Sequence, residues 1–286
     1  MSWFVRNTRT AIGQPTLIPQ YLWWVLLRMS GYSGHEARMV TGIRWGGFAS
    51  FGDYLSQRDA PTPAIREYVR LALGNEAVVL DIGANLGSFS LYVCSCGIRC
   101  RSVVAFEPVL DTFKKLQANV GRYGFPIRTE RLALGAAESD RVIMDVDPDS
   151  PATAAISRVA ATAGVTKVTT TMTTLDRFVE GHDISSIDLA KLDVEGSELE
   201  VIHGAEGTIR EGRLKAVCLE VCPSNLVRFG CSSKRLYETL RDLGYWIFLF
   251  DERQGRLSAP ISLDPFCALV LADVLCVHSS ARRLVN

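Results

Sequence analysis

The chain has 286 residues, and 31 Lys plus Arg balance 31 Asp plus Glu, so the formal net charge at pH 7 is zero. This length suits one α/β domain with an extension, and the neutral balance lacks the basic footprint of a nucleic-acid-binding protein. The eight cysteines form no C-x-x-C pair, which favours buried free thiols in a reducing cytoplasm. A metal-binding or redox role for Cys94, Cys96 and Cys100 is the alternative.

Residues 1–60 are expected to form a helical N-terminal extension, and residues 61–286 the main domain. The most apolar early stretch, residues 21–29, is shorter than the about 20 residues that span a bilayer. It also begins late for a signal peptide, Pro15 and Pro19 precede it, and no clear cleavage site follows it. We therefore expect a helix that packs on the domain or on a partner. A weak contact with a membrane surface through Trp23 and Trp24 is the alternative.

From residue 61 onward, apolar runs alternate with segments of helical periodicity. Thr62 is a candidate helix cap and Pro63 suits the first helical turn. Strands are expected at residues 78–82, 103–106, 127–134, 142–146, 165–171, 187–192, 214–221, 246–250 and 268–277, helices at 63–73, 87–93, 110–123, 197–209 and 234–243, and a loop at 147–164. This alternation predicts a mainly parallel sheet with helices on both faces, which binds ligands at the carboxyl ends of its strands.

The first of these strands runs into a glycine turn, residues 83–87, and then into a helix. Gly83 permits a sharp turn and close approach of a ligand, and Gly87 permits tight packing of the helix. A dinucleotide site would need a glycine where Asn85 stands, and a P-loop would need a Gly-Lys-Ser/Thr ending. Asp81 would repel a pyrophosphate, but it suits a ligand with an ammonium and a sulfonium group. S-adenosylmethionine carries both and has no phosphate.

Glu107 lies at the end of the second strand, 20 residues after Gly87. An acid at this place accepts hydrogen bonds from both ribose hydroxyls in nucleotide-binding folds. A solvated surface glutamate is the alternative, but the glycine turn upstream favours the ribose role. The third strand ends at Leu134 and Gly135 without an acid, so we expect backbone and apolar groups to hold the adenine.

Several motifs together resemble the FkbM family of S-adenosylmethionine-dependent methyltransferases. They are D-I-G-A-N-L-G at residues 81–87, A-F-E-P at 105–108, Asn119 in the following helix, T-L-D at 174–176, K-L-D-V-E-G-S-E at 191–198 and H-G-A at 203–205. In the last of these the family more often has Lys at the position of His203. The resemblance covers about residues 78–277.

The resemblance implies a Rossmann-like class I methyltransferase fold, with a seven-stranded, mostly parallel sheet whose last strand is inserted antiparallel. It implies O-methylation of a hydroxyl on a sugar, glycan or natural product. Separately, the neutral charge predicts no nucleic-acid partner, and the short apolar stretch predicts no transmembrane segment. Residues 1–60 and 147–164 lie outside the match and are expected to set the choice of acceptor. The expected cofactor-binding residues are Asp81, Gly83, Ala84, Asn85, Gly87, Glu107, Asn119 and Asp193.

A second group of carboxylates follows the fourth main strand. Asp193 and Glu195 are two residues apart, so in an extended segment they point the same way, and Glu220 ends the next strand. We name Asp193, Glu195 and Glu220 as catalytic candidates, acting as a general base on a hydroxyl. A second interpretation is that these three bind a divalent metal, which we do not expect. In a third, Glu195 and Glu198 cap a helix, Asp193 holds the cofactor and Lys191 forms a buried ion pair.

Two other classes of function compete with a methyltransferase. An NAD(P)-dependent Rossmann oxidoreductase is disfavoured by Asn85 and Asp81, for the reasons given above. A non-catalytic nucleoside-binding module is disfavoured by the intact acidic segment at residues 191–196. Histidine is the usual general base, but His203 lies two turns into a helix, where a packing or surface role is expected.

Overall fold

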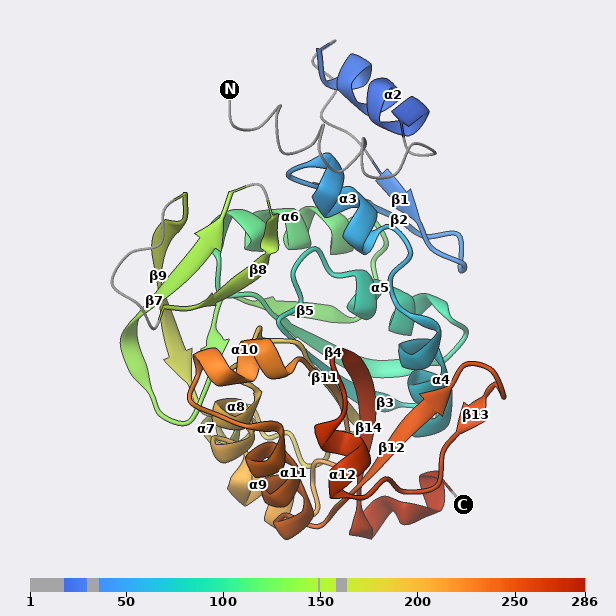
Figure 1. Ribbon diagram of the computed structural model, residues 1–286, viewed down its shortest axis with the longest axis vertical. Helices are drawn as coiled ribbons and strands as arrows, with labels where there is room; N and C mark the ends of the chain where they lie inside the picture. The colour runs from blue at the N-terminus through green and yellow to red at the C-terminus, as the bar shows by residue number, and fades with distance from the viewer. Residues whose placement is uncertain (1–17, 30–35, 149, 158–163, 286) are drawn as a thin grey trace.

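The structure, a computed structural model, describes residues 18–29, 36–148, 150–157 and 164–285. Its main feature is an eight-stranded sheet with the order β13-β12-β14-β11-β10-β3-β4-β5 (Figure 1). The strands are β3 (Ala77–Ile82), β4 (Cys100–Phe106), β5 (Ile127–Glu130), β10 (Leu189–Leu192), β11 (Ala216–Val221), β12 (Tyr245–Asp251), β13 (Arg256–Leu257) and β14 (Ala272–His278).

The pairing of these strands is that of a Rossmann-like class I methyltransferase. Strands β5, β4, β3, β10 and β11 run parallel, and β14 runs antiparallel between β11 and β12. The inserted antiparallel strand was expected, but the sheet has one strand more than the expected seven. The additional β13 pairs with the end of β12, across a turn in which Asp251 accepts hydrogen bonds from the N–H groups of Arg253 and Gln254.

Each face of the sheet has its own apolar core, because successive side chains of a strand point to opposite faces. On the fully buried β3, Val79 belongs to one core and Leu80 to the other. The Leu80 face is covered by α7 (Leu175–Gly181), α8 (Glu198–His203), α9 (Glu206–Arg210), α10 (Pro223–Arg228), α11 (Ser233–Asp242) and α12 (Leu263–Cys267), and the Val79 face by α4 (Pro63–Ala72), α5 (Ser88–Ser95), α6 (Leu110–Val120) and η2 (Ser279–Leu284).

Two helix boundaries follow local capping chemistry. Thr62 Oγ1 accepts a hydrogen bond from Ile65 N at 3.3 Å, so α4 begins where the sequence predicts. The single helix expected at residues 197–209 is wrong, because Gly204 separates α8 from α9. The Asp176 carboxylate accepts hydrogen bonds from Gly207 N and Thr208 N at 2.8 and 2.7 Å, which holds the start of α9 as a separate helix.

A second, four-stranded sheet lies beside the carboxyl ends of the main strands (Figure 1). It contains β6 (Ala133–Leu134), β9 (Thr166–Thr173), β7 (Ser139–Asp147) and β8 (Ser150–Ile156) in that order. The single strand expected at residues 127–134 is therefore wrong, since β5 and β6 belong to different sheets. The loop expected at 147–164 is also wrong over residues 150–156, which pair with β7 as β8; residue 149 and residues 158–163 lie outside the described residues.

The described part of the N-terminal region packs on the domain. It comprises α2 (Ile18–Met29), β1 (Glu36–Arg38), β2 (Arg44–Gly46) and α3 (Phe51–Gln57). Tyr21 and Trp24 of α2 pack against Phe51 of α3, and Trp45 of β2 is buried in the same core as α4 and α5. The expected helix at 21–29 is present as part of α2. Among the described residues, none of the helices combines the length and the apolar character needed to cross a membrane.

Candidate functional site

The glycine turn after β3 is held by main-chain contacts. Gly83 N and Ala84 N donate to Phe106 O at 3.1 and 2.8 Å, which ties the turn to the end of β4. Gly83 has φ +83°, and a Cβ there would overlap the carbonyl oxygen of Asp193. Gly87 has φ +87°, and a Cβ there would stand 2.6 Å from Leu116 Cδ1. Both glycines are therefore required by close packing as well as by backbone conformation.

Asp81, at the end of β3, is completely buried. Its Oδ2 accepts hydrogen bonds from Ser90 N and Ser90 Oγ at 3.2 and 2.7 Å, which fixes the first turns of α5 against the strand. Its Oδ1 has no hydrogen-bond partner among the described residues. Burial raises the pKa of Asp81, and the nearby Lys191 ammonium opposes that shift. A buried acceptor without a partner costs free energy, so this atom marks a place where a ligand donor belongs.

Glu107, at the end of β4, is 6% exposed and holds two backbone groups. Its Oε2 accepts a hydrogen bond from Asn85 N at 3.0 Å, and its Oε1 accepts one from Val109 N at 2.8 Å. Burial raises the pKa of Glu107 to about 7, although both backbone donors favour the ionised form. Each carboxylate oxygen has further lone pairs, so Glu107 can still accept hydrogen bonds from a ligand.

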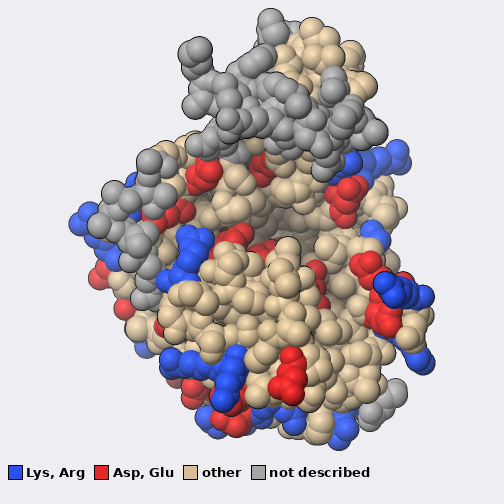
Figure 2. Space-filling view, in the orientation of Figure 1, with Lys and Arg blue, Asp and Glu red and all other residues tan. Residues whose placement is uncertain are grey.

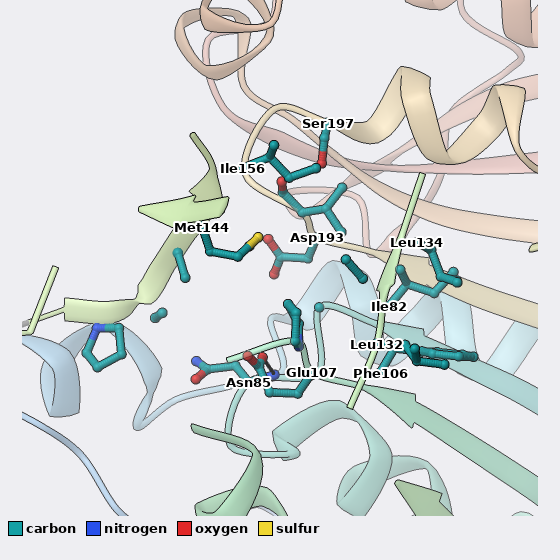
Figure 3. A pocket seen from close by; sticks show the side chains of 17 residues that line it. Ile82, Asn85, Phe106, Glu107, Leu132, Leu134, Met144, Ile156, Asp193 and Ser197 are labelled. Carbon is teal, nitrogen blue, oxygen red and sulfur yellow. Dashed lines mark hydrogen bonds between the residues drawn. The ribbon is translucent and has the colours of Figure 1, made fainter. Parts of the chain in front are cut away.

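Glu107 lines the first of two adjoining cavities. This cavity lies between the ends of β3 and β4, β6 and the β7–β8 hairpin. Figure 3 shows apolar side chains facing this space from several elements, while Glu107, Asn85 and Asp193 supply its polar edge. The apolar side chains labelled there are Ile82, Phe106, Leu132, Leu134, Met144 and Ile156. This arrangement suits a flat apolar ring with a polar substituent at one end.

The second cavity, of about 1060 Å³, shares Gly83, Asn85 and Asp193 with the first. Its walls come from the end of α3, residues 60–62, the start of α4 and β8. Gln57 of α3 connects this wall to the glycine turn, since its Oε1 accepts a hydrogen bond from Asn85 Nδ2 at 2.8 Å. Gln57 Nε2 in turn donates to Asp53 Oδ1 at 2.5 Å. Nothing in the sequence pattern indicated this role of Gln57.

The predicted carboxylates meet at the second cavity, where Asp193, Glu195 and Glu220 all contribute to the lining. Lys191 Nζ donates to Asp193 Oδ2 at 2.7 Å. Burial alone would lower the pKa of Lys191, but the Asp193 and Asp81 carboxylates outweigh burial and raise it. Lys191 is therefore a permanent cation that is already paired.

The sequence predicts an extended backbone at Glu195. Instead, Glu195 follows the end of β10 in a left-handed conformation with φ +55°. Its Oε2 accepts a hydrogen bond from Asn225 Nδ2 at 2.8 Å. Burial raises the pKa of Glu195 to about 7, with further contributions from Asp193 and Glu198. Glu198 Oε1 accepts a hydrogen bond from Gly196 N at 3.0 Å, so this glutamate holds the turn before α8.

Glu220 has no hydrogen-bond partner among the described residues and is half-buried near the end of β11. Burial raises the pKa of Glu220 to about 8, and the neighbouring carboxylates of Asp193, Glu195 and Asp273 act in the same direction. Asp273 of β14 also lines the cavity, and its Oδ2 accepts a hydrogen bond from Thr62 Oγ1 at 2.9 Å. The sequence analysis missed Asp273. Its one signal was an acid within an otherwise apolar strand.

The metal interpretation of Asp193, Glu195 and Glu220 gains no support. Within the described part of the chain, no group of three or more His, Cys, Asp and Glu side chains is arranged to hold a metal ion.

Asn119, a further predicted cofactor-binding residue, lines neither cavity. It bonds Gly46 N, Gly46 O and Leu86 O at 3.1, 3.0 and 2.9 Å, and thus fastens β2 and the glycine turn to α6.

The sheet order, the glycine turn and the acids after β3, β4 and β10 define a Rossmann-like class I methyltransferase. Residues 81–247 match the model of the methyltransferase FkbM domain, which is more than half of the chain. The chain belongs to the FkbM methyltransferase family.

Individual relatives match smaller parts. The hexuronic acid methyltransferase AglP of Haloferax volcanii is 30% identical over 148 residues, which are 51% of this chain and 58% of AglP. The AMB antimetabolite synthetase AmbE of Pseudomonas aeruginosa is 46% identical over 70 residues, which are 24% of this chain and 3% of AmbE. The chain thus spans less than two thirds of either relative.

Solved structures are more distant. Methyltransferase FkbM from Methylobacillus flagellatus KT is 18% identical with a TM-score of 0.41, over 71% of this chain and 44% of that one. TrmK of M. capricolum, solved with S-adenosylhomocysteine, is 11% identical with a TM-score of 0.41, over 75% of this chain and 67% of that one.

Proposed function

We propose that the protein transfers a methyl group from S-adenosylmethionine to a hydroxyl of a sugar, glycan or natural product. The observation that carries the proposal is the pair of adjoining cavities. One is apolar with Glu107 at its edge, the other is rich in carboxylates, and both meet at Gly83 and Asp193. One cavity suits a nucleoside and the other a polar acceptor beside it. The relative AglP, named for a hexuronic acid, supports a sugar as the class of acceptor.

The first cavity fits adenosine. Ile82, Phe106 and Leu134 provide apolar surfaces for a flat base. The carboxylate of Glu107 can accept hydrogen bonds from ribose hydroxyls while it keeps the backbone N–H groups of Asn85 and Val109. Because this carboxylate is buried, a lost hydrogen bond to it would cost more than one at the surface.

The charge around the glycine turn favours a phosphate-free cofactor over a dinucleotide. Asp81 and Asp193 lie beside the turn, and these two carboxylates would repel a pyrophosphate. Asn85, with φ +49°, stands where a dinucleotide site has its middle glycine. The partnerless Oδ1 of Asp81 fits the donors and the positive charge of a sulfonium amino acid. Bound there, S-adenosylmethionine would supply a methyl group activated on a sulfonium sulfur.

Glu195 is the proton acceptor in this proposal. As the acceptor oxygen forms its bond to the methyl carbon, the hydroxyl proton passes to the Glu195 carboxylate. Burial raises the pKa of Glu195 to about 7, and a base acts best when its pKa lies near the working pH. Asp193, which is paired with Lys191 and lines both cavities, would orient the groups that react.

The test combines binding with turnover. Titration calorimetry should show S-adenosylhomocysteine binding to the protein and no binding of NAD or NADP. With a panel of simple glycosides and polyols as acceptors, Glu195→Gln should lower kcat by about 10²–10⁴-fold and leave the Kd for S-adenosylhomocysteine unchanged. Glu252→Gln, at an exposed position with the same change of charge, is the matched control.

Two results would contradict the proposal. Preferential binding of NAD or NADP would favour an oxidoreductase. Tight binding of S-adenosylhomocysteine without transfer to any acceptor, together with an unchanged Glu195→Gln variant, would favour a nucleoside-binding module. Turnover that a chelator abolishes and a divalent cation restores would instead assign the carboxylates to a metal.

A further inference from the structure

The second cavity carries a strong excess of negative charge. Its lining includes Asp81, Asp193, Glu195, Glu220 and Asp273, against a single described cation, Lys191. That cation is already bonded to Asp193. In the space-filling view, Asp and Glu atoms lie inside the hollow below the N-terminal region (Figure 2). An anion that entered this cavity would lose its hydration and meet a lining with more acids than cations, which is unfavourable on both counts.

Two of these acids face each other across neighbouring strands. Glu220 of β11 and Asp273 of β14 are direct partners in the antiparallel ladder, and both side chains line the cavity. Like charges directly opposite each other in a sheet destabilise it. Asp273 has Thr62 as a hydrogen-bond partner, but Glu220 accepts no hydrogen bond from the described residues. The pair is therefore unfavourable when both carboxylates are ionised, and either a proton on Glu220 or a bound cation would relieve the repulsion.

A second observation, on the atom that the proposed function assigns to the amino-acid end of the cofactor, shows that the cavity belongs to a ligand-binding space. Asp81, which lines the same cavity, is completely buried and keeps its Oδ1 without a partner. Buried polar atoms are nearly always bonded, so the few exceptions indicate where a ligand supplies the donor. The acids are thus part of a binding space and not a solvated surface patch.

The Glu220–Asp273 pair lies on the acceptor side of this space. In the sheet order, β11 is two strands from β3 and β14 is three. Neighbouring strands are about 4.8 Å apart, which places the pair roughly 10–15 Å from the glycine turn. The nucleoside, held at β3 and β4, does not extend over this pair, so the pair is free to contact the acceptor.

We propose that the methyl acceptor carries an ammonium group, and that Glu220 and Asp273 bind this group while the neighbouring hydroxyl is methylated. Acceptors with a carboxylate or phosphate close to the hydroxyl, nucleic acids included, are excluded by the same charges. In this respect the chain differs from AglP, which is named for an acidic sugar. The inference rests on the proposed function, since it concerns the acceptor of that same site.

The protonation of the site agrees with this assignment. Burial raises the pKa of Glu220 to about 8, and Asp193, Glu195 and Asp273 act in the same direction while Lys191 opposes them. Burial also raises the pKa of Asp273. A bound ammonium would favour the ionised form of both carboxylates.

The experiment compares three matched probes by titration calorimetry on the protein saturated with S-adenosylhomocysteine at pH 7. The probes are the methyl glycosides of glucosamine, glucose and glucuronic acid, which differ in charge and share a sugar ring. The glucosamine derivative should bind at least about tenfold more tightly than the glucose derivative, as expected for a charge-assisted hydrogen bond. The glucuronic acid derivative should bind most weakly.

Two variants connect this preference to the pair. Glu220→Gln combined with Asp273→Asn should abolish the preference for the amine and leave the Kd for S-adenosylhomocysteine unchanged, whereas Glu252→Gln should keep the preference. Equal affinity for the three probes, tightest binding of the glucuronic acid derivative, or no binding of the amine at millimolar concentration would overturn the inference. Failure of S-adenosylhomocysteine itself to bind would instead overturn the proposed function.

Discussion

The carbonyl oxygen of Asp193 occupies the position beside Gly83 that a Cβ would need, so the glycine turn after β3 touches the backbone at the end of β10. The chain positions the acids of both segments through this contact. Asp193 N also donates to Ile82 O at 3.0 Å, so both main-chain polar groups of Asp193 contact the β3 segment and its side chain lies at the junction of the two cavities.

Gly83→Ala should therefore destabilise the fold. The added methyl group would overlap the Asp193 carbonyl, and the residue would also have to adopt φ +83°. Together these effects should lower the free energy of unfolding by about 2–4 kcal/mol, measured by urea denaturation. Gly74→Ala is the control, since a Cβ at Gly74 has no neighbour within 4 Å. An equal, small effect of both substitutions would show that the turn can shift.

Glu107→Gln should weaken binding of S-adenosylhomocysteine. An amide keeps the size of the side chain but loses the charge and one acceptor, so the Kd should rise by the equivalent of about 1.5–3 kcal/mol, or roughly 10–150-fold. Titration calorimetry measures the change, and the exposed Glu252→Gln variant should bind as the unmodified protein does. An unchanged Kd in the Glu107 variant would refute contact with the ribose.

Asn119→Ala should affect stability more than binding. The substitution removes hydrogen bonds to Gly46 and Leu86 in a buried place, which should cost about 1–3 kcal/mol in the free energy of unfolding. Gln117→Ala, at an exposed position of the same helix, should be nearly neutral. If Asn119→Ala left stability intact and abolished binding of S-adenosylhomocysteine, Asn119 would contact the cofactor directly.

The buried carboxylates should make the ligand-free protein less stable as the pH rises. Glu195 and Glu220 have a folded pKa of about 7 and about 8, above their ordinary value of 4.5. A raised folded pKa stabilises the protein fully below pH 4.5, and this contribution is lost as the pH rises through the folded value. Between about pH 4.5 and pH 8, Glu220→Gln should therefore gain stability relative to the unmodified protein.

Thermal unfolding over this pH range measures the difference between the two proteins, so that contributions of other groups cancel. Glu252→Gln should show a pH profile parallel to that of the unmodified protein. A Glu220→Gln profile parallel to both would mean that Glu220 titrates normally.

Much of the fold, and the place of the first cavity at the ends of β3 and β4, could be predicted from the sequence because both depend on short-range patterns. The apolar run of β3, the glycines after it and the acid after β4 lie within 31 residues of one another, from Ala77 to Glu107. Because these strands are parallel, their carboxyl ends lie at one edge of the sheet. No further signal in the sequence is needed to predict this. Parallel pairing with both faces covered leaves few alternatives.

The features that were missed depend on contacts between distant segments. Gln57 reaches Asn85 across 28 residues, and Thr62 reaches Asp273 across 211. Strand β8 is a run of small residues that becomes a strand through its pairing with β7. The sequence predicts one strand at residues 127–134, yet β5 and β6 join different sheets. No local periodicity encodes such partners, because tertiary contacts decide them.

The position of β14 has a consequence for how the protein folds during its synthesis. This strand is the last of the main sheet in sequence, but it lies between β11 and β12, which are made earlier. During synthesis those two strands emerge without their shared neighbour. Their facing edges stay unpaired until β14, which ends at His278, has been made. Because β14 also delivers Asp273 opposite Glu220, the lining of the second cavity is complete only once this last strand has joined the sheet.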